Sequence, residues 1–231
     1  MKHRIGKRLL SASEFVRQDA YLADIGTDHA YLPLFLLSEG RIQRAVCSDV
    51  NAGPLENAER NAKELGLADK ISFILTDGAK GLSDMGITDY TVCGMGGELI
   101  AEIIESSPHL KNENIRLILQ PMSRQAYLRR YLSENGFAII AESYSRDAGK
   151  FYLSLVAEYD GIRRELTDLE AEFGTLYDTR VNLSEAEEGY LNTKLNALKK
   201  AASGKVGAGA HDCYESRLLI EYNERNRKSD C

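Results

Sequence analysis

Paired cysteines, long apolar runs and a secretory signal are all missing from this sequence. Its four cysteines, Cys47, Cys93, Cys213 and Cys231, are scattered without the spacing of a zinc site or a disulfide framework. No apolar run approaches the ~20 residues that cross a bilayer. The basic N-terminus lacks the apolar core of a signal peptide. These absences predict a cytoplasmic protein with reduced thiols, no metal and no membrane segment.

An excess of positive charge is missing as well, since the formal net charge is −6. The balance does not indicate a nucleic-acid-binding protein by itself. The basic residues are nonetheless unevenly placed, and the clusters include Arg4, Arg8, Arg129 and Arg130. Local basic patches on an acidic protein can bind a phosphate backbone. Any single cluster is more typical of a solvated helix face balanced by nearby glutamates.

Predicted strands and helices alternate over the first 160 residues. Strands are expected at 20–25, 44–48, 71–75, 90–93 and 115–119, the last ended by Gln120-Pro121. Helices are expected at 4–17, from Tyr31, and at 52–65, 98–106 and 123–134. Strands at 137–145 and 150–158 flank a hairpin turn. The alternation predicts a doubly wound α/β sheet, mostly parallel with one antiparallel strand.

The composition changes after Gly161. Residues 162–202 contain no proline and carry leucines and aromatics at three- and four-residue steps, and 212–226 shows the same pattern beyond a glycine-rich break at 203–209. This periodicity predicts a helical coiled-coil appendage. We therefore expect one domain at residues 1–160 and a second at 161–231.

The most informative stretch runs from Asp24 through Gly26 to Asp28. It follows an apolar strand and precedes a helix, and ligands of doubly wound sheets bind at the carboxyl ends of such strands. Gly26 would permit close approach of a cofactor. Asp49 follows the next strand at close to the ~20-residue spacing at which a carboxylate meets ribose hydroxyls. The ends of the third and fourth strands supply Asp77 and Gly78, which would border an adenine, and Gly94.

The turn lacks the full Gly-x-Gly-x-x-Gly pattern of a dinucleotide site. Asp28 stands where a glycine would admit a pyrophosphate, and its charge would repel one. A cofactor with ammonium and sulfonium groups suits an acidic turn better. The spacing therefore favours S-adenosyl-L-methionine over a nicotinamide dinucleotide.

Four segments of the sequence resemble the TrmK family of bacterial tRNA (adenine-N1) methyltransferases. These are Ala23 to Pro33, Asp49 to Leu55, Gly94 to Ile100 and Leu119-Gln120-Pro121. The resemblance implies a class I (Rossmann-like) methyltransferase fold, S-adenosyl-L-methionine as methyl donor and position 22 of tRNA as target. It covers about residues 4–160, and the helical tail matches the family's C-terminal coiled coil in kind.

Methylation of adenine N1 needs an extruded base and alignment rather than a strong base. In class I amino-methyltransferases a Pro-Pro-aromatic loop follows the fourth strand. Here Gly94, Gly96 and Gly97 would instead make space for the flipped base, with Met95 as an apolar contact. A glycine-rich helix entry without a substrate role is the alternative.

Three residues of the turn are candidates for the chemistry. Asp28 would accept a hydrogen bond from adenine N6–H and stabilise the methylated cation; alternatively it caps the next helix or holds the cofactor ammonium. His29 would contact substrate or support the turn. Tyr31 would stack on the base or pack locally.

Three questions stay open at this point. The basic residues and the tail are candidates for phosphate contacts, but the tail would equally form a homo-oligomer or bind a protein. A methyltransferase of the same fold acting on a small molecule or a protein is one alternative function. A non-catalytic module that binds S-adenosyl-L-methionine or RNA is another.

Overall fold

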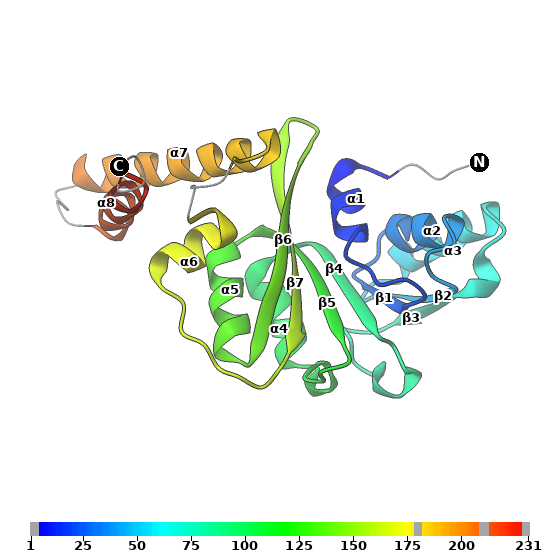
Figure 1. Ribbon diagram of the computed structural model, residues 1–231. Helices are drawn as coiled ribbons and strands as arrows, with labels where there is room; N and C mark the ends of the chain where they lie inside the picture. The colour runs from blue at the N-terminus through cyan, green and yellow to red at the C-terminus, as the bar shows by residue number, and fades with distance from the viewer. Residues whose placement is uncertain (1–4, 178–181, 208–212, 228–231) are drawn as a thin grey trace.

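The computed structural model describes residues 5–177, 182–207 and 213–227. A seven-stranded sheet crosses the molecule in the order β3-β2-β1-β4-β5-β7-β6 (Figure 1). Strands β1 to β5 pair in parallel, and β7 runs antiparallel to both β5 and β6. The predicted mostly parallel sheet with one antiparallel strand is therefore confirmed. The strands are β1 (Tyr21–Ile25), β2 (Arg44–Asp49), β3 (Ile71–Leu75), β4 (Asp89–Gly96), β5 (Arg116–Ser123), β6 (Phe137–Asp147) and β7 (Lys150–Tyr159).

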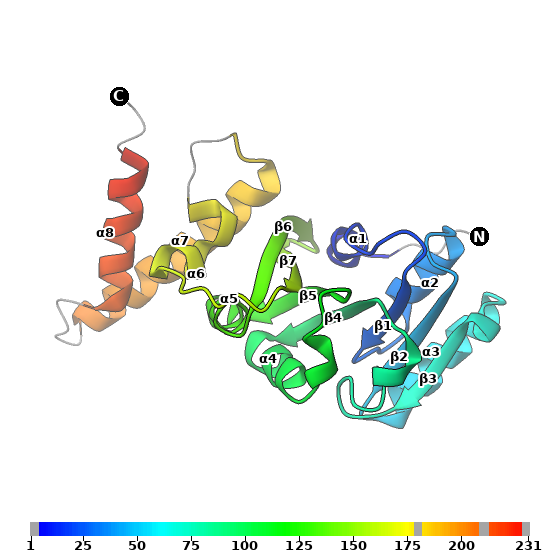
Figure 2. The same ribbon diagram turned by 60° about the horizontal axis from the view of Figure 1, so that its bottom comes forward.

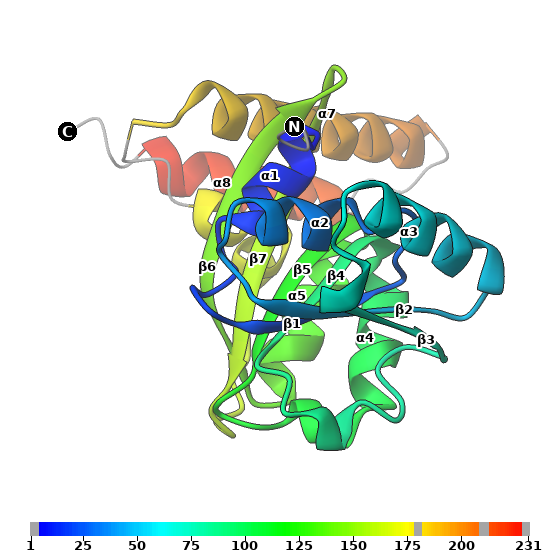
Figure 3. The ribbon, with the colours of Figure 1, turned by 90° about the vertical axis from the view of Figure 1, so that its right-hand side faces the viewer.

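Helices cover both faces of the sheet, as Figure 3 shows for α2 and α3 on one side and α4 and α5 on the other. Successive strand residues point to opposite faces, so Leu22 packs in the apolar cluster beneath α2 and α3, whereas Ala23 packs in the second cluster. Because both faces are buried, the strands are nearly continuous apolar runs. The helices are α1 (Lys7–Ser13), α2 (Tyr31–Ser38), α3 (Ala52–Glu64), α4 (Gly97–Glu105) and α5 (Gln125–Glu134).

Two strands extend further than the sequence predicts. β4 continues through Gly94 and Met95, and β5 continues through Pro121, which pairs with Met95 across a shifted register. Gly94 has φ +85°, a conformation that glycine adopts without strain and that permits a bulge. The prediction that Pro121 ends the strand is wrong, because a proline is tolerated where the ladder is already irregular. The first helix is also shorter than the predicted 4–17.

The chain beyond β7 forms the helices α6 (Asp168–Phe173), α7 (Glu185–Gly207) and α8 (Tyr214–Arg227), with a 3-10 turn at Gly174–Tyr177. A capping box between Thr167 and Glu170 begins α6. α6 packs on α5, α7 contacts β6 and β7, and α8 packs on α7 and α6. In Figure 2, α7 and α8 form a V at the end of the molecule farthest from β3.

The C-terminal helices share one apolar cluster with the sheet. Phe173, Leu191 and Leu218 belong to the same cluster as Leu128 and Phe137. The predicted helices are confirmed, although α7 continues through Ser203 into the expected break; residues 208–212 lie outside the described residues. The division at residue 160 stays a prediction. Within the described ranges, no helix is long and apolar enough to cross a membrane.

Candidate functional site

The turn after β1 lies where the carboxyl ends of β1, β2 and β4 meet. The backbone N–H groups of Gly26 and Thr27 both donate to the carbonyl oxygen of Ser48, at 2.8 and 3.0 Å. Gly26 has φ +71°, and a Cβ there would lie 1.9 Å from the terminal methyl of Met95. The turn therefore requires glycine for its backbone conformation, and the flexible end of Met95 lies directly against it.

A cavity of about 190 Å³ opens beside this turn. It brings together six residues that the sequence nominated, from three separate segments. One comes from α1, four come from the end of β1 and its turn, and one comes from the start of α2. They are Arg8, Asp24, Gly26, Asp28, His29 and Tyr31.

Asp24 is the buried carboxylate of the cavity. Thr91 Oγ1 donates to Asp24 Oδ1 at 2.7 Å, and Thr27 Oγ1 donates to Oδ2. Burial raises the pKa of Asp24, while the two threonine hydroxyls and the charge of Arg8 act in the opposite direction. Thr27 and Thr91 were not nominated from the sequence. Thr91 could have been found from the sequence, because it is a polar residue within an otherwise apolar strand.

Asp49 ends β2, next to the Gly26 turn. Its Oδ1 accepts from the backbone N–H of Asn51 at 2.7 Å, which orients the half-buried carboxylate. Its Oδ2 accepts no hydrogen bond from the described residues. Asp49 therefore keeps acceptor capacity for a ligand at the strand ends.

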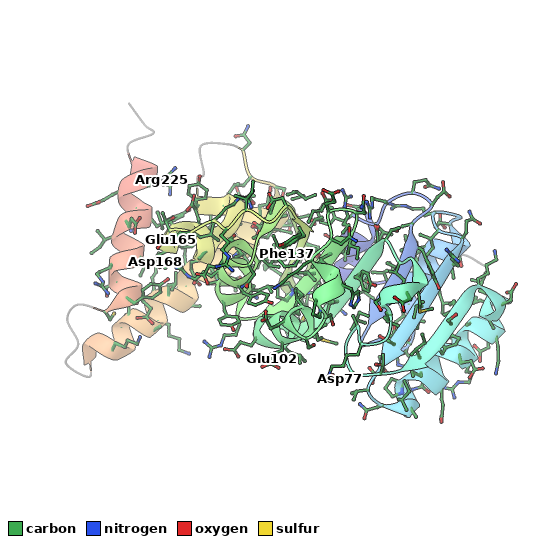
Figure 4. All side chains as sticks on the ribbon, turned by 90° about the horizontal axis from the view of Figure 1, so that it is seen from below. Asp77, Glu102, Phe137, Glu165, Asp168 and Arg225 are labelled. Carbon is green, nitrogen blue, oxygen red and sulfur yellow. The ribbon has the colours of Figure 1, made fainter. Side chains whose placement is uncertain are left out.

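Asp77 and Gly78 lie beyond β3 and do not line this cavity. Asp77 is exposed and forms an ion pair with Lys80 at 2.5 Å. Figure 4 shows it on the side of the molecule away from Asp168 and the C-terminal helices. Gly78 accepts a 3.3 Å hydrogen bond from Ser48 Oγ, and a Cβ there would contact Ile103. Gly78 thus helps to fasten the loop to β2 and α4.

Asp28, His29 and Tyr31 form a row along the cavity mouth. His29 Nε2 lies 3.3 Å from Asp28 Oδ2, and the rings of His29 and Tyr31 stack with centroids 5.0 Å apart. The Asp28 side chain is 71% exposed. α2 begins after Ala30, and no side chain caps it. The alternative in which Asp28 caps the helix is therefore wrong.

The glycines after β4 have distinct surroundings. The Gly94 N–H donates to Gln120 Oε1 at 3.1 Å, and Gly96 lies beside Ser123. Gly97 is buried, and a Cβ there would lie 2.5 Å from the carbonyl oxygen of Arg124. Gly97 therefore permits close packing of α4 against the chain after β5, as the helix-entry alternative expects, and a substrate contact at Gly97 stays a prediction.

The four nominated arginines differ in their placement. Arg129 was expected to contact phosphate, but it is 1% exposed and pairs with Glu142 at 2.6 Å, so that expectation is wrong. Arg130 donates to the Leu166 carbonyl and pairs with Asp168, which ties α5 to α6. Arg8 points into the cavity rather than outward. Arg4 lies outside the described residues.

The residues present fit S-adenosyl-L-methionine. Gly26 leaves a cradle that only a flexible methionine end occupies, and Asp24 and Asp49 supply acceptors for cationic and hydroxyl groups. The acidic side chains disfavour a phosphorylated ligand. Among the described residues, no group of three or more histidine, cysteine, aspartate or glutamate side chains is placed to hold a metal.

Comparison with known proteins places the chain among methyltransferases. Residues 5–155 match the family model described as "Methyltransferase domain". The tRNA (adenine(22)-N(1))-methyltransferase of Bacillus subtilis is 35% identical over 69% of this chain and 70% of its own length.

Two solved structures extend the likeness to the C-terminal helices. A Streptococcus pneumoniae protein in complex with S-adenosyl-L-methionine is 34% identical, with a TM-score of 0.81 over 96% of this chain and 99% of that one. The Bacillus subtilis M1A22 tRNA methyltransferase TrmK is 28% identical, with a TM-score of 0.77 over 98% of this chain and 97% of that one.

Proposed function

This chain belongs to the TrmK family of tRNA (adenine22-N1)-methyltransferases, and from that premise we propose that it methylates N1 of adenine 22 in tRNA, with S-adenosyl-L-methionine as donor. The observation that carries the proposal is the cavity at the end of β1, together with Asp49 at the neighbouring end of β2. There Gly26, Asp24 and Asp49 combine the space and the acceptors that this cofactor requires.

The cofactor is held by residues of the first two strand ends. Asp49 accepts from the ribose hydroxyls through its available oxygen, and Gly26 permits close approach of the ligand. Asp24 faces the cofactor's positive charge. When bound, S-adenosyl-L-methionine supplies an electrophilic methyl group on its sulfonium. Asp77 and Gly78 remain proposed neighbours of the adenine, at the end of β3 beside β2.

The target base enters beside Met95. The Met95 side chain lies over the Gly26 turn. Gly94 and Gly96, which have no side chains, leave space along the path of the base. Because adenine N1 is paired or stacked in folded RNA, the base must be extruded to reach this edge. Tyr31, 42% exposed at the cavity mouth, offers a ring on which the extruded base can stack.

Asp28 is the proposed catalytic residue. Adenine N1 carries a free lone pair and no proton, so the protein needs to align the base and stabilise the resulting cation rather than remove a proton. The exposed Asp28 carboxylate is available to accept from adenine N6–H, which places negative charge beside the methylated ring. His29, which contacts both Asp28 and Tyr31, holds these two side chains in place.

The role of the C-terminal helices, the domain division and the cellular location are proposed from the sequence pattern. A coiled coil of α7 and α8 and a homo-oligomer through them rest on the apolar spacing of their residues. RNA contacts along these helices rest on their clustered lysines, and the division at residue 160 rests on the change of composition after Gly161. The cytoplasmic location rests on the scattered cysteines and stays a prediction.

The direct test is methyl transfer from labelled S-adenosyl-L-methionine to unmodified tRNA, with the product nucleoside identified by mass spectrometry. We expect N1-methyladenosine from a transcript with adenine at position 22 and none from a matched transcript with guanine there. Transfer to another base or position contradicts the proposed specificity. Cofactor binding without incorporation favours the small-molecule methyltransferase or the binding module.

A further inference from the structure

We propose that Gln120 is a positioning residue for the target base, because its side chain holds the irregular segment of Gly94 and Met95 in the shape that admits that base. The inference rests on the proposed function, since it assigns a residue to the entry path of the adenine. Gln120 is fully buried and does not line the cavity, so it acts through Gly94 and Met95 rather than by contact with the substrate.

The ladder between β4 and β5 is broken at this segment. The two strands run side by side in parallel (Figure 1), and Cys93 is the partner of Gln120. The next pair joins Met95 to Pro121, so Gly94 has no partner on β5 in this register. Pro121 has no N–H and cannot donate to β4. The Gly94 N–H therefore takes its acceptor from outside the ladder.

The side chain of Gln120 supplies that acceptor. Its Oε1 accepts from the Gly94 N–H at 3.1 Å and also from Nη1 of Arg8. Two donors that converge on one oxygen fix the orientation of the amide. Its Nε2 then points the other way and donates to Met122 Sδ at 3.5 Å. Because the buried amide is held on both sides, it fixes where Gly94 lies relative to β5.

The place of Gly94 decides where the next side chain goes. The terminal methyl of Met95 lies against the Gly26 turn, where a Cβ on Gly26 would meet it at 1.9 Å. Gly94 is exposed and has φ +85°, so its backbone can turn freely once the amide no longer holds it. A shift of Gly94 carries Met95 across the entry path of the base. Misplacement of a reacting group by ~1 Å costs about 100-fold in rate.

Two other roles for Gln120 have weaker support. Cofactor binding through Arg8 is one, because Arg8 lines the cavity. However, the Arg8 N–H donates to Asp147 Oδ2 at 3.2 Å, which ties α1 to β6 without Gln120. Stability of the fold is the other. Because Gly94 is exposed, water can replace the lost acceptor there. The position of Gly94 is therefore the property that depends on Gln120 most directly.

The test is single-turnover methylation of a tRNA transcript with adenine at position 22, at saturating S-adenosyl-L-methionine. Gln120→Leu keeps a side chain of similar size and removes the acceptor. We expect the rate to fall about 10- to 100-fold, while the dissociation constant of S-adenosylhomocysteine in a calorimetric titration stays the same. Gln18→Leu changes an exposed glutamine and is the matched control, which should leave both quantities unchanged.

Two conservative variants separate the reach of the side chain from its chemistry. Gln120→Glu keeps an acceptor at the same length, so it should restore the rate to near that of the wild type. Gln120→Asn keeps the amide but withdraws it by one methylene, so it should be about as slow as Gln120→Leu. Because both variants keep the buried position polar, they give a result even if Gln120→Leu does not fold.

The other outcomes overturn the proposal in different ways. A wild-type rate in Gln120→Asn or Gln120→Leu shows that the acceptor is not needed, and a slow Gln120→Glu shows that an acceptor is not enough. A loss of rate matched by weaker binding of S-adenosylhomocysteine assigns Gln120 to the cofactor through Arg8. If the wild-type protein itself does not methylate the transcript, the proposed function fails before any variant is measured, which distinguishes that failure from the others.

Discussion

Two arginine–carboxylate clusters in this protein have opposite designs. At the cavity, Asp24 accepts from two threonine hydroxyls and does not form a direct ion pair with Arg8. At the junction with the C-terminal helices, Arg129 and Glu142 pair at 2.6 Å and are both 1% exposed. The first cluster leaves charge available to a ligand. In the second, protein groups meet both charges, and of the side-chain atoms of the pair only Nη2 of Arg129 has no hydrogen-bond partner among the described residues.

The second cluster shows what a structural ion pair needs. Glu142 accepts from Arg129 Nε, from the Tyr144 hydroxyl at 2.9 Å and from the Thr175 N–H at 2.9 Å. Arg129 also donates to the carbonyl of Ala171 in α6 at 2.9 Å. These bonds connect α5, β6 and the chain after α6, so the pair fastens the C-terminal helices to the sheet. A ligand site needs donors and acceptors that protein groups do not already occupy.

The largest expected effect comes from breaking the closed cluster. Glu142→Gln leaves the Arg129 charge buried without its counter-ion, so the free energy of unfolding should fall by about 3–5 kcal/mol in a urea titration. Glu185→Gln is the matched control, because Glu185 pairs with Arg146 at 3.0 Å while 84% exposed and should cost close to nothing. Equal losses in the two variants would contradict the contrast between them.

A second expected effect falls on the open site. Asp49→Ala removes the acceptor at the end of β2, so S-adenosylhomocysteine should bind about 10- to 100-fold more weakly, with stability nearly unchanged. Calorimetric titration measures the affinity, and a thermal melt checks the fold. Asp69→Ala, an exposed aspartate before β3, should leave the affinity as it was. Unchanged binding in Asp49→Ala would remove this residue from the cofactor site.

A smaller effect is expected at the cavity mouth. Asp28→Asn keeps the shape and removes the charge that would stabilise the methylated base, so kcat should fall about tenfold while the affinity for S-adenosylhomocysteine stays the same. Single-turnover kinetics on tRNA measures the first quantity and titration the second. A variant with full turnover would show that Asp28 has no part in the chemistry.

The smallest expected effect is a difference between Glu142 and Asp24 in how protein stability depends on pH. Arg129 and the hydrogen bonds hold the pKa of Glu142 below its usual value, so its contribution to stability is present above about pH 4.3 and is lost as the pH falls through the folded-state pKa. Burial raises the pKa of Asp24, so its ionisation opposes folding as the pH rises through the folded-state value.

At neutral pH, Asp24→Asn should therefore unfold at an equal or slightly higher urea concentration than the wild type, although it binds S-adenosylhomocysteine more weakly. Titration and urea unfolding on the same sample measure both properties. A clear loss of stability in Asp24→Asn would place Asp24 in the same structural class as Glu142.

The local sequence pattern was sufficient to predict the part of the candidate site that lies at the ends of β1 and β2. The turn at Gly26 and the carboxylate of Asp49 follow from an apolar strand, a glycine and a helix in sequence order. Parallel strands bring their carboxyl ends to one edge, so the end of β2 was expected beside the Gly26 turn, and the N–H groups of Gly26 and Thr27 donate to the Ser48 carbonyl there. Asp28, His29 and Tyr31 line the cavity because they follow Gly26 in the same turn and at the start of α2.

The same reasoning failed where a residue's role depends on contacts from a distant segment. Arg129 and Arg130 are adjacent and basic, which is typical of an exposed patch, but α6 and β6 provide partners for both. Gln120 follows the apolar residues of β5, and no neighbouring residue in the sequence indicates that its Oε1 accepts from Arg8 and Gly94.

The sequence by itself determined the order of strands and helices, the acidic glycine turn and the class of ligand that suits it, because these depend on local periodicity and on charge. Only the tertiary structure decided which way each arginine points. Arg8 meets a ligand cavity and Arg129 a buried glutamate, because α1 packs against β6 and β7 while the C-terminal helices pack on α5. Burial and counter-charge come from the packing of distant segments, which no local pattern records.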